Sequence, residues 1–169
     1  MTNREALLQA LVALTAGEPS LPPAALDEPE PSHWLARMGA APIAGELLHA
    51  LAVQDATPET LAFVRGAEID EAGEELEFTP IIAYAVQAKP GVGDTVETLR
   101  AARRQARDEG VRLIADLIAQ NRTLGVEAEV YAEVMPPARD DDVAFVNALP
   151  SATALIPIRI LYTGRDAAS

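Results

Sequence analysis

The chain has 169 residues, a length that fits one domain over residues 1–169 and excludes two large ones. Its 26 acidic and 13 basic side chains give a formal charge of -13, so general binding to nucleic-acid phosphates is not expected. It has no cysteine, which excludes disulfides, thiolate nucleophiles and thiolate metal sites. No apolar run approaches the roughly 20 residues of a membrane helix, and no signal peptide is evident, so we expect a soluble protein without membrane contact.

The first third of the chain predicts a helix followed by an extended connector. Apolar residues at helical spacing predict a helix over residues 3–16 that packs through Leu7, Leu8, Leu11 and Leu14. Thr2 and Glu5 are spaced as its capping box. Prolines alternating with acidic residues predict an extended connector over 18–31, and the spacing of further leucines predicts a short helix over 43–52.

The remaining elements predict an α+β fold. Strands are expected over 61–65 and 77–88, joined by the acidic stretch 68–75, with Pro80 at an edge or a bulge because it has no N–H. A long helix over 95–121 follows, capped by Asp94 with Glu97, and strands are expected over 127–135 and 152–163. Gly110 within this helix indicates either close approach to the sheet or a bend. This order predicts an antiparallel or mixed sheet with helices on one face.

No pattern of catalytic or ligand-binding residues stands out. His33 and His49 lack the spacing of metal ligands, and His49 is best interpreted as an ordinary helix residue. The glycines of residues 91–95 lack the Lys-Ser/Thr of a phosphate-binding loop, which favours a plain strand-to-helix turn. Asp140, Asp141 and Asp142 lack the spacing of a calcium loop, which favours a solvated acidic loop. We therefore expect no catalytic, cofactor-binding or metal-binding residues, and no enzyme.

Two charged segments are candidates for a protein interface. The long helix carries Arg100, Arg103, Arg104, Arg107 and Arg112. These side chains fit equally well a solvated face with local pairs to Asp108, or a basic stripe that docks on an acidic loop of another copy. The stretch 136–150 is predicted to be a projecting loop, too long for a tight hairpin, that becomes ordered only in an assembly. Its three aspartates would face water or a partner, and Phe145 would be an apolar anchor at an interface.

The distal half of the chain resembles the tail terminator proteins of tailed bacteriophages. The resemblance covers residues 61–162 and is carried by the order of elements. These are a long strand, a long helix closing with Asn121-Arg122-Thr123-Leu124-Gly125, the strand Val126-Glu127-Ala128-Glu129-Val130, a wide loop, and the last strand Ile156-Pro157-Ile158-Arg159-Ile160-Leu161-Tyr162. Residues 18–60, a proline-rich connector and a short helix, lie outside the resemblance and form an insert-like region.

The resemblance implies a structural virion protein without catalytic residues. It would form a ring, a hexamer in this family, that caps the completed tail tube and joins it to the head-side connector protein. DNA would pass through the ring without specific binding, which suits an acidic protein. The location would be the tail or neck of the virion, after assembly in the bacterial cytoplasm, with Phe145 seated on the tail tube protein. Alternatives are another head–tail connector or a tail-tube subunit and, further off, a small-molecule-binding domain or an enzyme.

Overall fold

A computed structural model describes residues 4–22, 24–26, 47–55, 60–61, 74–88, 93–126, 129–146 and 149–164. It confirms the α+β fold class. The elements in chain order are α1 (Arg4–Ala16), β1 (Ala24–Leu26), β2 (Leu47–Gln54), β3 (Thr60–Leu61), β4 (Glu74–Phe78), β5 (Ile81–Ala88), α3 (Val96–Gln120), β6 (Val130–Val134), β7 (Ala138–Val146) and β8 (Leu149–Gly164).

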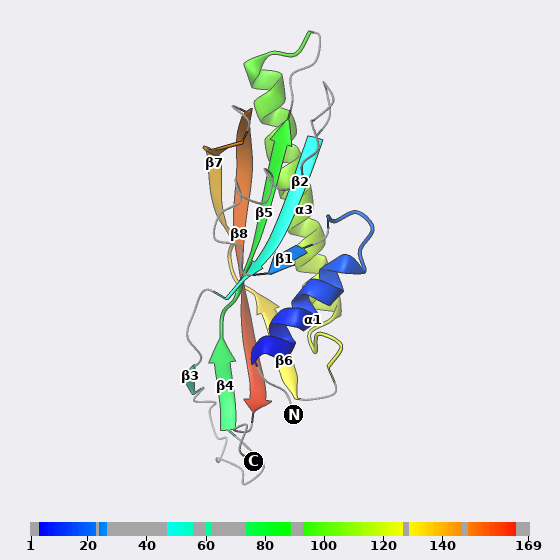
Figure 1. Ribbon diagram of the computed structural model, residues 1–169, viewed down its shortest axis with the longest axis vertical. Coiled ribbons are helices and arrows are strands. Elements are labelled where there is room, and N and C mark those ends of the chain that lie inside the picture. The colour runs from blue at the N-terminus through cyan, green and yellow to red at the C-terminus, as the bar shows by residue number, and fades with distance from the viewer. Residues whose placement is uncertain are drawn as a thin grey trace.

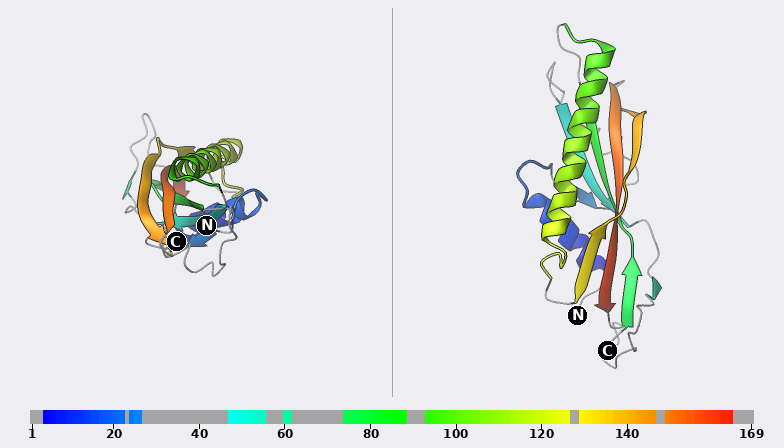
Figure 2. Two further views of the ribbon diagram at one scale, coloured as in Figure 1. Left: turned by 90° about the horizontal axis from the view of Figure 1, so that it is seen from above. Right: turned by 180° about the vertical axis from the view of Figure 1, so that it is seen from behind.

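The strand β8 is the axis of the sheet, and every pairing except one is antiparallel (Figure 1). Its first part, residues 149–157, lies between β5 and β7, with β2 and then β1 beyond β5; β1 and β2 are the parallel pair. We call this group the upper sheet. Its last part, residues 158–164, lies between β4 and β6, with β3 beyond β4, and we call this group the lower sheet. The molecule is elongated along β8 (Figures 1 and 2).

Prolines stand at the level where the upper sheet meets the lower sheet. Pro80 separates β4 from β5, and its carbonyl accepts a hydrogen bond of 2.9 Å from the amide of Ile158. Pro157 lies on β8 at the same level, opposite Ile81, and its carbonyl accepts a 2.9 Å hydrogen bond from Met135. Because proline has no N–H to donate, the ladder is interrupted there. The predicted single strand 77–88, with Pro80 at an edge or a bulge, is therefore two strands, β4 and β5, that Pro80 separates.

The prediction of a short helix over 43–52 is wrong, because residues 47–54 form the strand β2. This strand pairs along its whole length with β5, and Ala50, Leu51, Ala52 and Val53 are consecutively buried. A strand covered on both faces is a continuous apolar run, and such a run also contains the i, i+4 spacing of a helix. Residues 43–46 lie outside the described residues.

The prediction of a projecting loop over 136–150 is also wrong. Residues 138–146 form β7, which is the first strand of an antiparallel pair with β8. The register shifts between Asp141 and Ala144, so a bulge takes up extra residues of β7. Charged residues and a bulge are common on edge strands because they discourage pairing with other chains. The aspartates that indicated a loop therefore fit an edge strand equally well.

Other predicted boundaries agree with the structure in part. The connector over 18–31 contains the short strand β1, and of the predicted strand 61–65 only Leu61, at the end of β3, lies within the described residues. The predicted strands 127–135 and 152–163 correspond to β6 and β8. The predicted acidic loop over 68–75 lies outside the described residues except for its last two, which already belong to β4.

The N-terminal helix packs as predicted. In α1, Leu7, Leu8 and Leu11 are fully buried and Leu14 partly so, which confirms the stripe expected from the spacing. Arg4 ties the helix to both halves of the molecule. Its guanidinium pairs with Asp55 at the end of β2 and lies 4.7 Å from the centre of the Phe78 ring in β4. Thr2 of the predicted capping box lies outside the described residues.

The long helix α3 lies along the upper sheet, against β5 and β8, and its C-terminal part reaches β6 (Figure 2, right). Its capping residue is Thr95 rather than the predicted Asp94: the Thr95 hydroxyl accepts from the Thr98 amide, and the Thr98 hydroxyl accepts from the Thr95 amide. Gly110 marks close approach to the sheet, because a Cβ there would lie 2.2 Å from Cε1 of Tyr84. That decides between the two interpretations of this glycine.

Candidate functional site

The arginines of α3 divide between the interior and the surface. Arg100 is exposed and Arg104 half-buried, whereas Arg103 and Arg107 are only 3% and 4% exposed. Positions 103 and 107 lie on the stripe that buries Ile114 further along the helix, since residues at i, i+4, i+7 and i+11 share one face. A solvated face is therefore the wrong interpretation for Arg103 and Arg107, and a basic stripe shared by all four is not present on the surface.

Asp108 makes an ion pair with a strand residue that the helical spacing did not predict. Its carboxylate lies 3.1 Å from Nε of Arg107, the adjacent residue, and 3.4 Å from Nε of Arg139 in β7. The second contact joins the helix to the edge strand of the upper sheet. Arg112, which is four residues after Asp108 and was a candidate for a local ion pair with it, is exposed.

The acidic candidates and Phe145 lie on the backbone of β7. Asp140 pairs with Thr153, Asp141 with Ala152, and Phe145 with Pro150; Asp142 lies within the bulge. The side chains of these four candidates lie outside what the structure describes. The structure therefore places them on the edge strand of the upper sheet, one strand from β5, and leaves their role at an interface as a prediction.

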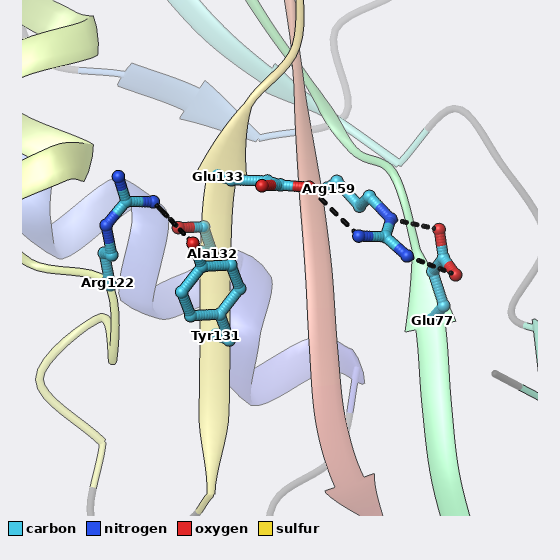
Figure 3. A network of polar contacts seen from close by, with 6 residues as sticks. All are labelled: Glu77, Arg122, Tyr131, Ala132, Glu133 and Arg159. Atoms are coloured by element: carbon cyan, nitrogen blue, oxygen red, sulfur yellow. Dashed lines mark hydrogen bonds and ion pairs between the residues drawn. The ribbon is translucent and has the colours of Figure 1, made fainter. Parts of the chain in front are cut away.

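The outer face of the lower sheet carries an ion-pair network that the sequence analysis missed (Figure 3). Arg159 of β8 donates from Nε to Glu77 of β4 at 2.7 Å and from Nη1 to Glu133 of β6 at 3.0 Å. One guanidinium thus bridges both neighbouring strands, and these contacts raise the pKa of Arg159 above its already high usual value. The available signal was the alternation of charged with apolar residues along each strand, which places the charges on one face.

Arg122, in the turn after α3, covers the free edge of β6. The amide of Ala132 donates to the Arg122 carbonyl at 2.8 Å, and Nη1 of Arg122 donates to the Ala132 carbonyl at 3.3 Å (Figure 3). The same guanidinium lies 5.2 Å from the ring centre of Tyr131, which is 44% exposed. These contacts occupy part of the edge that another chain would need for strand addition.

A shallow hollow of about 350 Å³ opens beside Tyr131 at the end of the lower sheet. Its walls contain two carboxylates, and none of the described residues that line it is basic. The lining residues are Glu75, Thr123, Glu129, Val130, Tyr131, Leu161, Tyr162 and Thr163. Within the described part of the chain, the only hydrogen bond to these carboxylates is a long one of 3.5 Å, from the Thr163 hydroxyl to Glu129. The hollow therefore favours a cationic group.

The upper sheet holds a histidine–tyrosine pair next to α3. Nδ1 of His49, on β2, is hydrogen-bonded to the hydroxyl of Tyr84 on β5. Burial lowers the pKa of His49, and burial together with the nearby charge of Glu109 raises the pKa of Tyr84 to about 12. His49 is thus a strand residue rather than the helix residue that we predicted. The pair lies beneath the Gly110 contact and fixes the packing of α3 on the sheet.

Further chemical groupings are few in the described part of the chain. There, no three His, Asp or Glu side chains gather closely enough to hold a metal ion, and no helix is long and apolar enough to cross a membrane. The sequence matches no model of a known protein family and no curated protein.

Proposed function

We propose that this chain is the subunit of a ring that terminates a bacteriophage tail. The ring, a hexamer, would cap the finished tail tube and join it to the head-side connector protein, while DNA passes through its channel. The observation that carries the proposal is the order of elements. An N-terminal helix, a sheet, one long helix packed on that sheet, and a last strand with Tyr162 near its end are common to the family and to this chain, whereas the wide loop of the resemblance is the strand β7 here.

Charge supports the same proposal. A chain with 26 acidic and 13 basic side chains repels the DNA backbone, which suits a ring through which a duplex slides. Two edge strands are also protected against indefinite strand addition, β6 by Arg122 and β7 by a bulge. Association would then proceed through side-chain surfaces, which allows a closed ring rather than an open fibre.

The test uses purified wild-type protein and preassembled tail tubes. We expect closed rings by electron microscopy, a mass six times that of the subunit, and rings bound at one end of each tube that stop its growth. Tubes formed by the protein alone would instead indicate a tail-tube subunit, and rings that bind only the head-side connector would indicate another connector protein. A protein that forms no ring, alone or on tubes, contradicts the proposal.

A further inference from the structure

The Arg159 network shows how the outer face of the lower sheet binds a guanidinium group. Arg159 stands on the central strand β8, and the carboxylates of Glu77 and Glu133 approach it from the strands on either side. The side chains of Arg159, Glu77 and Glu133 are 36%, 29% and 34% exposed, so the network lies at the surface. One cation held between two carboxylates is thus a stable arrangement on this face.

A second pair of carboxylates flanks β8 four residues further along, with a threonine in place of the arginine. Thr163 pairs with Glu75 of β4 on one side, and its amide donates to the Glu129 carbonyl at 3.2 Å on the other. Residues 159 and 163 lie on the same face, because side chains alternate along a strand. Glu75 and Glu129 therefore flank Thr163 from the two neighbouring strands, as Glu77 and Glu133 flank Arg159, although Glu77 is paired with Leu161 and reaches Arg159 diagonally. Among the described residues, no cation lies between Glu75 and Glu129.

The hollow beside Thr163 has the lining of a guanidinium site. Two carboxylates and the hydroxyl groups of Thr123 and Thr163 provide hydrogen-bond acceptors, and Tyr131 and Leu161 provide apolar surface. Arginine suits such a site better than lysine, because its planar group binds carboxylates through two donors and stacks on apolar surfaces.

The chain also carries an exposed arginine without an ion pair of its own. Arg112 lies on the exposed face of α3, and no described carboxylate contacts it. Its neighbour at i-4, Asp108, is already in contact with Arg107 and Arg139. Arg112 of one copy and the hollow of another are therefore complementary in charge.

We propose that the hollow formed by Glu75, Glu129, Tyr131 and Thr163 receives the Arg112 side chain of a second copy. This inference rests on the proposed function, since it names the contact between neighbouring subunits of the ring. The two surfaces lie on different parts of one chain, so the contact is heterologous and repeats around a ring. Because each copy carries a charge of -13, copies repel one another at long range, and a local attraction of this kind fixes where they meet.

Two charge-reversed variants test the contact. Glu75→Arg with Glu129→Arg makes the hollow basic, and Arg112→Glu makes the helix face acidic. Each variant alone would juxtapose like charges, so we expect self-association to weaken at least about tenfold, measured by sedimentation velocity. Circular dichroism should show both variants folded, because the substituted side chains lie at or near the surface.

Mixing the two variants is the decisive experiment. In an alternating ring, the basic hollow of the first faces the acidic helix of the second, and the native hollow of the second faces the native Arg112 of the first. We therefore expect an equimolar mixture to regain wild-type association, while each variant alone stays dissociated. Val96→Glu, which places an acidic side chain at an exposed position at the N-terminal end of α3, away from the proposed contact, is the control and should assemble normally.

The outcomes separate this inference from the proposed function. If either variant assembles alone as wild type does, or if the mixture stays dissociated, the Arg112 contact is wrong even when wild-type rings still cap tail tubes. If the mixture regains association but wild-type rings do not bind tail tubes, the Arg112 contact is supported and the proposed tail-terminator function is wrong. A wild-type chain that remains monomeric at every concentration overturns both. Binding of an arginine-rich peptide from another protein, with no self-association, also overturns the contact between copies.

Discussion

The two sheets that share β8 differ in how their faces are covered. In the upper sheet one face packs Ile82 and Tyr84 in the main core, and the opposite face buries Ala83 and Ala85 as completely. In the lower sheet one face is buried, while the other exposes the carboxylates and the guanidinium of the Arg159 network. The upper sheet is thus buried on both faces, and its alanine face requires small side chains. The lower sheet has one exposed face that is available for contacts.

The largest effect should come from a polar residue on the second buried face of the upper sheet. Ala85 is fully buried, so Ala85→Gln must both enlarge the side chain and bury an amide. We expect the free energy of unfolding to fall by about 3 kcal/mol or more. Leu161→Gln on the half-exposed outer face of the lower sheet is the matched control and should cost about 1 kcal/mol or less. Equal losses in urea unfolding would contradict the difference between the two sheets.

The next effect tests the close approach of α3 to the upper sheet. Gly110→Ala places a methyl group against the Tyr84 ring, so the helix must shift. We expect a net loss of about 1–2 kcal/mol in thermal unfolding, because overpacking exceeds the roughly 1 kcal/mol that alanine adds to helix propensity. In a Tyr84→Leu background the same substitution should cost less, and a double-mutant cycle measures that coupling. Strict additivity would show that the ring does not limit the helix.

Sequence patterns predicted those elements whose burial is one-sided. The helices α1 and α3 bury one stripe each, so their leucines and isoleucines revealed the helical period. Gly110 was compatible with close approach to the sheet or with a bend, and only the contact with Tyr84 decides between the two. The strand β2 is buried on both faces, and its apolar run carries no period of two. The prediction for the edge strand β7 failed for the opposite reason, since its charged residues are as typical of a protected edge strand as of a loop.

The candidate site depended on relations that a single sequence does not display. Arg159, Glu77 and Glu133 come from three strands, and only the register between them makes one cation bridge two carboxylates. Arg103 and Arg107 misled in the other direction, because charge suggested solvent while their helical positions point to the sheet. Residue type indicates where a side chain would be stable, and the pairing of distant segments decides where it lies.

A smaller effect should follow from removing the cation of the lower sheet. Arg159→Met leaves Glu77 and Glu133 near each other without a bridging charge. These groups are about one-third exposed, so solvent screens them and we expect a loss of about 0.5–1 kcal/mol. The loss should shrink in high salt, as surface electrostatics does, whereas Arg159→Lys should retain part of the stability. A salt-independent loss would indicate that the arginine acts through packing alone.

The smallest effect should be a dependence on pH that belongs to the upper sheet. Burial lowers the pKa of His49 below its usual value of 6.5, so the unfolded chain binds a proton more readily than the folded chain. Stability is therefore fully present above the unfolded pKa and falls as the pH drops through the folded pKa. His49→Gln, which can still hydrogen-bond the Tyr84 hydroxyl but cannot titrate, should flatten this part of the pH profile.

The alkaline side of the profile should respond to Tyr84 and not to His49. The folded pKa of Tyr84, about 12, exceeds the usual tyrosine value of 10.0, so folding favours the protonated phenol, and stability declines as the pH rises beyond the unfolded pKa. Tyr84→Phe keeps the ring that Gly110 contacts and removes the ionisation, so the alkaline decline should weaken while the acid limb shows His49 alone. Urea unfolding of wild type and both variants across this pH range measures the two limbs separately. If His49→Gln altered the alkaline limb or Tyr84→Phe left it unchanged, other groups would govern the pH dependence. A clean separation would assign it to one buried pair, in the sheet that is covered on both faces.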